Sequence, residues 1–358
     1  MNNKIGLYIH VPFCLSKCPY CDFYSERYSR TLAGQYKQAV MRNLEYYGGD
    51  FDTVYFGGGT PILLAEEISE ILGKIQHDAN AEITVEANPC VCDEKRLGVL
   101  FKSGVNRLSI GVQSLNEREL VFLGRRHSAQ QAENAIACAY NVGFRNISAD
   151  LMLGLVGQTK ESVLYSIQRL SELPLTHISA YLLKVEEGTP FAQRTLALPD
   201  EEQSAELYLF AVEQLEKHGF MQYEISNFAH SGFKSRHNLH YWHCDEYLGI
   251  GPAAHSYYNG KRFCTERNLS EFLSSEHQRT TVTDDEPGDF DEFAMLALRL
   301  TEGLKFSDCS RFDISMNSIV ECCKKIPKKY INITNNGISL TREGFLVSNA
   351  VIGAILGY

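Results

Sequence analysis

Short apolar segments alternate with helical segments over the first two-thirds of the chain, and this alternation limits the possible folds more than any other feature. The apolar segments, rich in β-branched and aromatic residues, are 5–11, 53–56, 82–87, 107–113, 147–153 and 177–183. The segments with helical periodicity are 31–47, 65–77, 93–102, 129–141, 160–171 and 200–217. Strands that alternate with helices form right-handed βαβ units and a parallel sheet. Six such units predict an α/β fold, an open and partial (β/α)6 barrel.

Polar, glycine or cysteine residues stand where these predicted strands end. They are Cys14, Gly57–Gly59, Glu86, Gln113 and Asp150. Ligands of such folds lie at the carboxyl ends of the strands. Polar groups on otherwise apolar strands cost free energy unless they meet a partner. We therefore expect these residues to line the mouth of a ligand site.

The last third of the chain has a different pattern. We predict a barrel domain over 1–228, ending in a strand at QYEISNFA (222–229), and a connecting region over 229–284 that is rich in histidine, aromatic residues and glycine. Residues 285–358 combine helices with a hairpin around an Asn-Gly turn, which predicts a small, mostly helical domain of winged-helix type.

Charge and cysteine content limit the classes of function. Lys and Arg number 34 against 44 Asp and Glu, a formal charge of −10, and no cationic run occurs. Nucleic acid is therefore not an expected partner. The 11 cysteines and the lack of a recognisable targeting segment predict a protein of the reducing cytoplasm without disulfides.

Three of the cysteines form a compact loop directly after the first predicted strand. Cys14, Cys18 and Cys21 have the spacing C-x3-C-x2-C. Thiolates are ligands for iron–sulfur clusters and for zinc. Because a cuboidal cluster usually takes four cysteines, three would leave one iron free to bind another molecule. The alternative is a zinc site with His10 as the fourth ligand.

The cysteine loop resembles the signature of the radical S-adenosylmethionine (SAM) superfamily. Further motifs resemble one branch of it, which holds the oxygen-independent coproporphyrinogen III oxidases and the haem chaperones of the HemW type. These motifs are FGGGTP, EANP, GVNRLSIGVQS, LGRRH, DLMLGLVGQT, YEISNFA and LGIGPAAHS. The resemblance spans about residues 5–350 and implies a 4Fe–4S cluster on the three cysteines, with SAM on the open iron.

The same resemblance assigns residues to the SAM site. The expected cofactor contacts are Tyr8, Tyr20, Gly58, Gly59, Thr60, Glu86, Gln113, Arg125 and Asp150. Glycines allow close backbone approach, and a carboxylate accepts hydroxyl or ammonium protons. Each residue also has an ordinary structural interpretation, a tight turn for the glycines and an ion pair for Arg125.

Three features favour the chaperones over the oxidases. The oxidases resemble C-x3-C-x2-C-x-C, whereas this chain has Phe23 at the fourth position, and their long N-terminal extension has no counterpart here. Residues 237–242 read His-Asn-Leu-His-Tyr-Trp, which resembles the H-N-x-x-Y-W motif attributed to haem binding. His237 is then the expected haem ligand, with Tyr241 and Trp242 as stacking partners. Core packing is the alternative interpretation of all three.

We therefore predict a haem-binding protein on a radical SAM scaffold. By the resemblance, it delivers haem to an acceptor haemoprotein such as a membrane respiratory enzyme, and it forms a homodimer. The alternative is an enzyme that oxidatively decarboxylates the propionates of coproporphyrinogen III.

Overall fold

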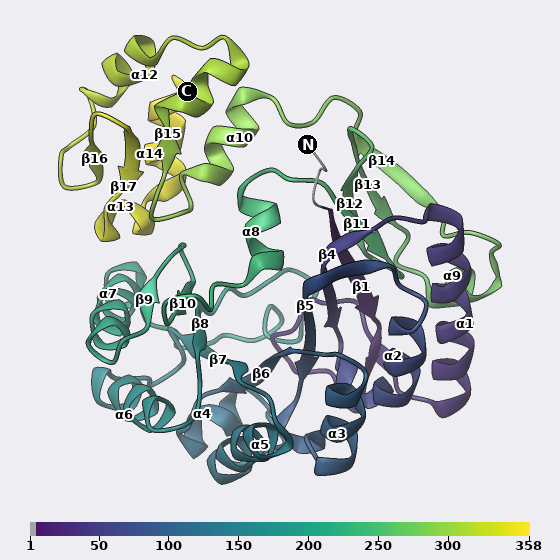
Figure 1. The fold of residues 1–358 in the computed structure, drawn as a ribbon. Coiled ribbons are helices and arrows are strands. Elements are labelled where there is room, and N and C mark those ends of the chain that lie inside the picture. The colour runs from purple at the N-terminus through teal and green to yellow at the C-terminus, as the bar shows by residue number, and fades with distance from the viewer. Residues whose placement is uncertain (1–4) are drawn as a thin grey trace.

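A computed structural model describes residues 5–358, in which six parallel strands curve into an open partial barrel (Figure 1). The six strands are β1 (Gly6–Val11), β4 (Phe51–Gly58), β5 (His77–Ala87), β6 (Arg107–Gln113), β7 (Asn146–Leu153) and β8 (His177–Leu182). They are hydrogen-bonded in this order, each parallel to the next. The barrel stays open because the two outer strands pair with other segments instead of with each other. All six coincide with the predicted strands, which confirms the partial (β/α)6 barrel.

Helices cover the outer face of the barrel strands and form an arc around them in Figure 1. They are α1 (Arg30–Tyr47), α2 (Ala65–Leu72), α3 (Glu94–Lys102), α4 (Glu117–Phe122), α5 (Ala129–Val142), α6 (Lys160–Ser171) and α7 (Glu201–Lys217). Their apolar faces join the strands in one large core. Asp200 caps the last of these helices, because its side chain accepts the backbone N–H of Gln203 at 2.8 Å.

Both edges of the barrel sheet carry additional strands. At one edge β11 (Tyr247–Ile250) pairs in parallel with β1, and three further strands follow in a meander. These are β12 (His255–Tyr258), β13 (Lys261–Thr265) and β14 (Thr280–Asp284). None of the four was predicted. The predicted connecting region therefore contributes strands to the main sheet.

At the other edge, the single strand predicted over 222–229 is wrong. The segment forms two short strands, β9 (Met221–Gln222) and β10 (Asn227–Ala229), and the second pairs antiparallel with β8. The chain turns between them because the buried Glu224 carboxylate accepts the backbone N–H of Ser226 at 2.7 Å, and it also accepts the Asn227 side chain.

The C-terminal segment packs around an apolar core of its own, at the upper left of Figure 1. Its elements are α10 (Phe290–Ala297), β15 (Leu304–Lys305), α11 (Phe306–Cys309), α12 (Met316–Cys323), β16 (Ile331–Ile333), β17 (Gly337–Leu340), α13 (Arg342–Leu346) and α14 (Ser348–Leu356). The order helix, strand, two helices and hairpin, with β17 in the centre of the sheet, is that of a winged helix. The hairpin was predicted from its Asn-Gly turn. The domain boundaries at 228 and 284 stay predictions.

The short helix α8 (Arg236–Trp242) closes the barrel at the amino ends of its strands. The carboxylate of Glu82, in the middle of β5, accepts the backbone N–H groups of Arg236 and His237, each at 3.1 Å. The Arg236 side chain also donates to the backbone of Asn80 and Asp52. A carboxylate at a helix amino terminus is stabilising, so these contacts hold α8 in place.

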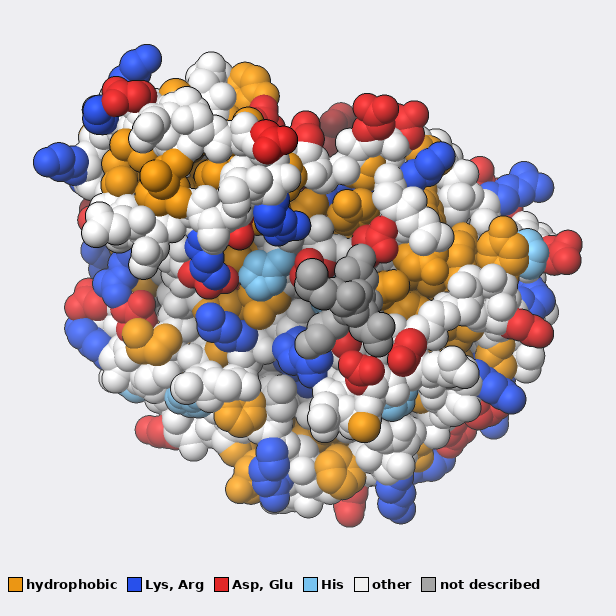
Figure 2. Space-filling view, turned by 45° about the horizontal axis from the view of Figure 1, so that its top comes forward, with side chains coloured by type: hydrophobic (Ala, Val, Ile, Leu, Met, Phe, Trp, Pro, Cys, Tyr) orange, Lys and Arg blue, Asp and Glu red, His pale blue; other side chains and the backbone are white. Residues whose placement is uncertain are grey.

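Charged side chains of both signs are interspersed on the face in Figure 2, including the C-terminal segment at its upper left. Within residues 5–358, no helix combines the length and apolar character that a bilayer crossing needs.

Candidate functional site

One pocket brings together most of the residues that the sequence analysis selected. It is lined by Cys14, Cys18 and Cys21 and by eight of the nine expected cofactor contacts. These eight are Tyr20, Gly58, Gly59, Thr60, Glu86, Gln113, Arg125 and Asp150. Because they follow or end different barrel strands, the parallel topology alone places them at one mouth.

The cysteine loop is fixed to the neighbouring turn by backbone contacts. The N–H of Thr60 donates to the carbonyl of Phe13 at 2.7 Å, and the Thr60 hydroxyl lies 3.5 Å from the Cys14 sulfur. The N–H of Cys21 donates to the carbonyl of Cys18 at 3.1 Å. Burial, with smaller contributions from the other two thiols, raises the pKa of Cys21. A bound metal replaces the thiol proton, so a loop of this kind suits a positively charged centre.

The donor set fits an iron–sulfur cluster better than zinc. Within the described chain, no three Cys, His, Asp or Glu side chains already stand in metal-binding geometry. The fourth zinc ligand would be His10, but both of its ring nitrogens have partners, the Tyr8 hydroxyl at 3.0 Å and the Tyr24 carbonyl at 2.9 Å. Burial also lowers the pKa of His10 to about 4. The thiols therefore form a three-cysteine donor set without a histidine.

The turn at Gly58 and Gly59 packs closely against the segment from His10 to Phe13. A Cβ at Gly59 would lie 2.5 Å from the Phe13 carbonyl oxygen, and one at Gly58 would lie 2.6 Å from the His10 ring. Gly58 also has a φ of 109°, which other residues rarely adopt. Packing alone therefore requires both glycines, and their backbone still faces the pocket.

Two carboxyl groups lie deeper in the pocket wall. Glu86 accepts the Tyr55 hydroxyl at 2.9 Å and the Gly58 N–H at 3.0 Å, and Asp150 accepts the Ser109 hydroxyl at 3.2 Å. Burial raises the pKa of Glu86 to about 7 and also raises the pKa of Asp150. Near neutral pH the Glu86 carboxyl can therefore donate or accept a hydrogen bond.

Arg125 connects the cysteine loop to the end of β6. Its guanidinium donates to the Gly111 carbonyl at 2.7 Å and lies 3.6 Å from the Cys18 sulfur and 3.4 Å from the Tyr20 hydroxyl. Burial lowers its pKa, but Tyr20 and Cys18 outweigh this, and the net shift is upward. The adjacent Arg126 is exposed. A fixed positive charge therefore stands beside the thiols.

Gln113 and Tyr8 hold different positions. Gln113 has a φ of 70°, an uncommon value for a residue with a side chain, and the β6–β7 register shifts between Ile110 and Gln113. Such a bulge redirects a side chain. Tyr8 does not line the pocket. Its hydroxyl bonds to His10, and its ring lies 6.1 Å from that of Tyr55.

The residues expected to bind haem lie in α8, at the closed end of the barrel. The nitrogens of His237 are paired with the Thr53 hydroxyl and the Tyr241 hydroxyl, each at 2.8 Å. The imidazole is 1% exposed and stacks on Tyr55 at 5.1 Å. Burial holds its pKa well below the usual value. Trp242 ends the helix and is half-buried. In this conformation neither His237 nitrogen is free for a metal.

The sequence analysis missed several residues of the same pocket. They are Tyr55, Arg107, Ser109, Ser179, Tyr181 and Asn238. Tyr55 stands two residues before Gly57, and the pairs Arg107/Ser109 and Ser179/Tyr181 each stand two residues apart, so the two-residue period of a strand is the signal that relates them. Asn238 belongs to the H-N-x-x-Y-W segment. That segment therefore reaches the pocket through its asparagine.

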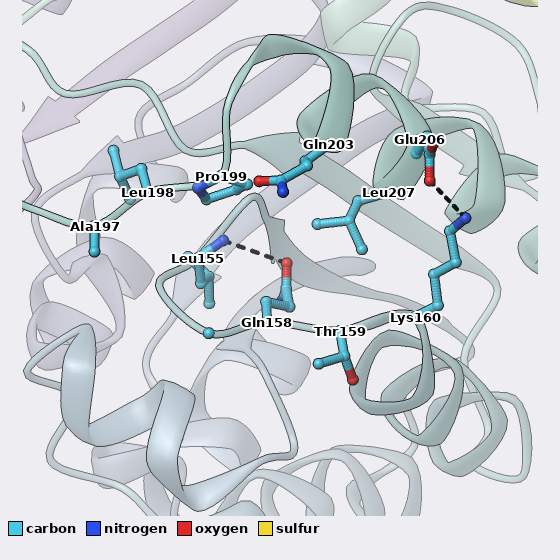
Figure 3. A pocket seen from close by; sticks show the side chains of 11 residues that line it. Leu155, Gln158, Thr159, Lys160, Ala197, Leu198, Pro199, Gln203, Glu206 and Leu207 are labelled. Atoms are coloured by element: carbon cyan, nitrogen blue, oxygen red, sulfur yellow. Dashed lines mark hydrogen bonds and ion pairs between the residues drawn. The ribbon is translucent and has the colours of Figure 1, made fainter.

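A second pocket lies between the loop after β7 and the start of α7 (Figure 3). Its polar side chains are paired with their neighbours. Gln158 accepts the Leu155 N–H at 3.4 Å, and Lys160 forms an ion pair with Glu206 at 2.8 Å. Because these groups already have partners, this pocket offers less for a ligand to bind than the cysteine pocket does.

Comparisons with known proteins agree with this geometry. Residues 8–170 match the family model described as the radical SAM superfamily. The haem chaperone HemW of Bacillus subtilis is 34% identical, over 98% of this chain and 98% of its own length. The HemW of Escherichia coli is 36% identical over 83% of each chain. Among solved structures, coproporphyrinogen III oxidase (HemN) from Escherichia coli covers 99% of this chain and 91% of its own, with a TM-score of 0.82 and 20% identity. At that identity the likeness shows the fold alone.

Proposed function

The chain belongs to the HemW family of haem chaperones within the radical SAM superfamily, and from this membership we propose that it binds haem and delivers it to an acceptor haemoprotein. Three relatives with this name align over 98% of the chain, at 32–34% identity. A membrane respiratory enzyme is the acceptor that we expect, and we place the protein in the cytoplasm, as a homodimer.

The observation that carries the proposal is the pocket that joins the three thiols to the SAM residues. Cys14, Cys18 and Cys21 would hold a 4Fe–4S cluster, since three thiolates in one loop leave one iron for another ligand. The cluster and SAM together supply one-electron chemistry when they are bound.

The side chains of this pocket suit the parts of SAM. Glu86 can accept protons from ribose hydroxyls or the amino group, and Arg125 can pair with the methionine carboxylate beside Cys18. The backbone at Gly58, Gly59 and Thr60 permits close approach of the ligand. Tyr20, Gln113 and Asp150 complete the wall.

The oxidase alternative has less support. Phe23 stands where the oxidases have a fourth cysteine, and it is 61% exposed at the edge of the pocket. The named relatives at 32–36% identity are chaperones, whereas the oxidase structure is 20% identical.

Haem ligation by His237 stays part of the proposal, with Tyr241 and Trp242 as covering rings. It requires a rearrangement, because an iron needs a ring nitrogen that Thr53 and Tyr241 now occupy. We therefore propose that haem binding through His237 is coupled to movement of α8 away from the barrel.

The deciding experiment uses the protein with its cluster reconstituted under anaerobic conditions. We expect a haem titration to give saturable binding, and an apo-haemoprotein added afterwards to gain its Soret absorption. The same preparation with coproporphyrinogen III, SAM and a reductant should yield no decarboxylated product. Absence of haem binding would refute the chaperone function, and multiple turnovers to protoporphyrinogen would establish the oxidase instead.

A further inference from the structure

The deepest wall of the pocket contains an arginine to which neither the sequence analysis nor the family motifs gave a role. Arg107 opens β6 and pairs in register with Thr84 and Asn146 on the neighbouring strands. Its side chain is 2% exposed, one of the largest buried side chains in the protein, and it lines the pocket. The guanidinium therefore lies inside the barrel.

This guanidinium lacks a partner within the described chain. Its Nε has no hydrogen-bond acceptor. Arg236, Arg262 and Arg342 each form an ion pair with an acidic side chain. Arg107 forms none within the described residues. A buried guanidinium is always charged, and an unpaired buried charge is costly. This buried Nε–H is therefore open to an acceptor atom of a ligand.

Two carboxyl groups on which the charge of Arg107 acts, those of Glu86 and Asp150, already have other partners. Tyr55 and Gly58 donate to Glu86, and Ser109 donates to Asp150. The charge of Arg107 lowers the pKa of both acids, but burial outweighs it and leaves each pKa raised. These acids therefore neutralise Arg107 incompletely, and a ligand carboxylate could still bind there.

The position of Arg107 separates it from the cysteine end of the pocket. Arg107 begins β6 and Gln113 ends it, so six residues at about 3.3 Å each put the two main chains roughly 20 Å apart. Arg125 already places one positive charge beside Cys18. Next to Arg107, the pocket offers the neutral polar groups of Ser179, Tyr181 and Asn238.

From these contacts we propose that Arg107 is a carboxylate anchor at the floor of the pocket, and that it binds a ligand through a charge-assisted hydrogen bond. Two carboxylates can reach this pocket, the methionine carboxylate of SAM and a propionate of haem. Binding of a haem propionate rests on the proposed function. The distance from the cysteine loop favours the propionate, since SAM must reach the cluster with its methionine end.

The test compares Arg107→Gln with Arg107→Lys, which keeps the charge, and with Arg145→Gln, a change of an exposed arginine. Haem, haem dimethyl ester and SAM are titrated separately into cluster-loaded protein, and melting curves report folding. We expect Arg107→Gln to weaken haem binding about tenfold or more and the lysine variant to weaken it less. The ester should bind the wild-type protein and all variants equally.

The outcomes distinguish the two carboxylates and the two proposals. A loss of SAM affinity alone would assign the anchor to the cofactor carboxylate. Unchanged affinity for both haem and SAM in folded Arg107→Gln protein would overturn the anchor. A wild-type protein that binds no haem would refute the proposed function, whereas the SAM titration would still decide the role of Arg107. If the glutamine variant does not fold, the lysine variant decides, because a loss of affinity there reports the geometry of the guanidinium.

Discussion

The two ends of the barrel carry the two most conspicuous motifs of the sequence, and their polar groups are arranged in opposite ways. At the mouth, the cysteine loop is held by its backbone while its thiols line an open pocket. At the closed end, both backbone N–H groups and side chains hold α8, and both nitrogens of His237 have partners. The comparison teaches that side chains free of partners indicate a ligand site more directly than the chemical type of the residues does.

Removal of the thiols should have the largest effect and test the open end. Replacing Cys14, Cys18 and Cys21 by alanine should abolish the visible absorption and the iron content of the reconstituted protein. The melting temperature of the cluster-free protein should change little, because backbone bonds hold the loop. Cys322→Ala, in the C-terminal segment, is the control and should bind a full cluster. Iron retained in the triple variant would contradict the assignment of this loop.

His237→Ala tests the closed end. It leaves the buried hydroxyls of Thr53 and Tyr241 without their partner, which should cost about 2–4 kcal/mol of unfolding free energy. The matched change His243→Ala removes an exposed histidine paired with Glu302 and should cost below about 1 kcal/mol. Chemical denaturation of the two variants gives both values. Equal stabilities would mean that α8 is not a structural closure.

The same His237 variant separates closure from haem ligation. Its Soret spectrum is recorded well below its melting temperature, where the fold is intact. A shifted Soret band would support His237 as the axial ligand. An unchanged band and affinity would limit this histidine to closing the barrel.

The pH dependence of the unfolding free energy should reveal the raised pKa of Glu86, the buried acid at the mouth of the barrel. Because the pKa of Glu86 in the folded protein is raised from 4.5 to about 7, the folded state keeps a proton that the unfolded chain releases. This group therefore disfavours folding increasingly as the pH rises from about 4.5 to 7, by roughly 3 kcal/mol in total. Glu86→Gln, which resembles the protonated acid, should remove that part of the pH dependence. Parallel stability profiles of the two proteins would show that the pKa of Glu86 does not change on folding.

The smallest effect should come from the rim of the pocket. Phe23 is 61% exposed, so Phe23→Ala should change the unfolding free energy by about 0.5 kcal/mol or less and leave cluster binding intact. Phe13 is fully buried beside the same loop, and Phe13→Ala should cost about 3–5 kcal/mol. Loss of the cluster in the Phe23→Ala protein would show that the Phe23 side chain contributes to cluster binding.

Much of the barrel could be predicted because its strands are buried on both faces and its helices on one. The apolar runs and the helical periodicity therefore appear directly in the sequence. The strands over 247–284 were missed because their side chains are largely half-buried or exposed, as in the fully exposed β14, and their register depends on a distant partner, β1. The two short strands over 221–229 depend on the turn at Glu224, which periodicity does not reveal.

The site was predictable to a similar extent. Residues at strand ends were found, since topology alone brings them together. Arg107 was missed because it lies at the start of its strand and reaches the pocket only through the barrel interior. The inaccessibility of His237 could not be predicted either, because it depends on Thr53, which is 184 residues away in the sequence.

The pairing of β1 with β11 has a consequence for biosynthesis. Gly6 lies opposite Tyr247, so one side of the first strand has no partner until about 240 more residues have been translated. At about 5–20 residues per second, that takes roughly 10–50 s. The cysteine loop thus leaves the ribosome well before its supporting sheet is complete. Insertion of iron and sulfide into a fully supported loop can therefore follow only after β11 has been translated.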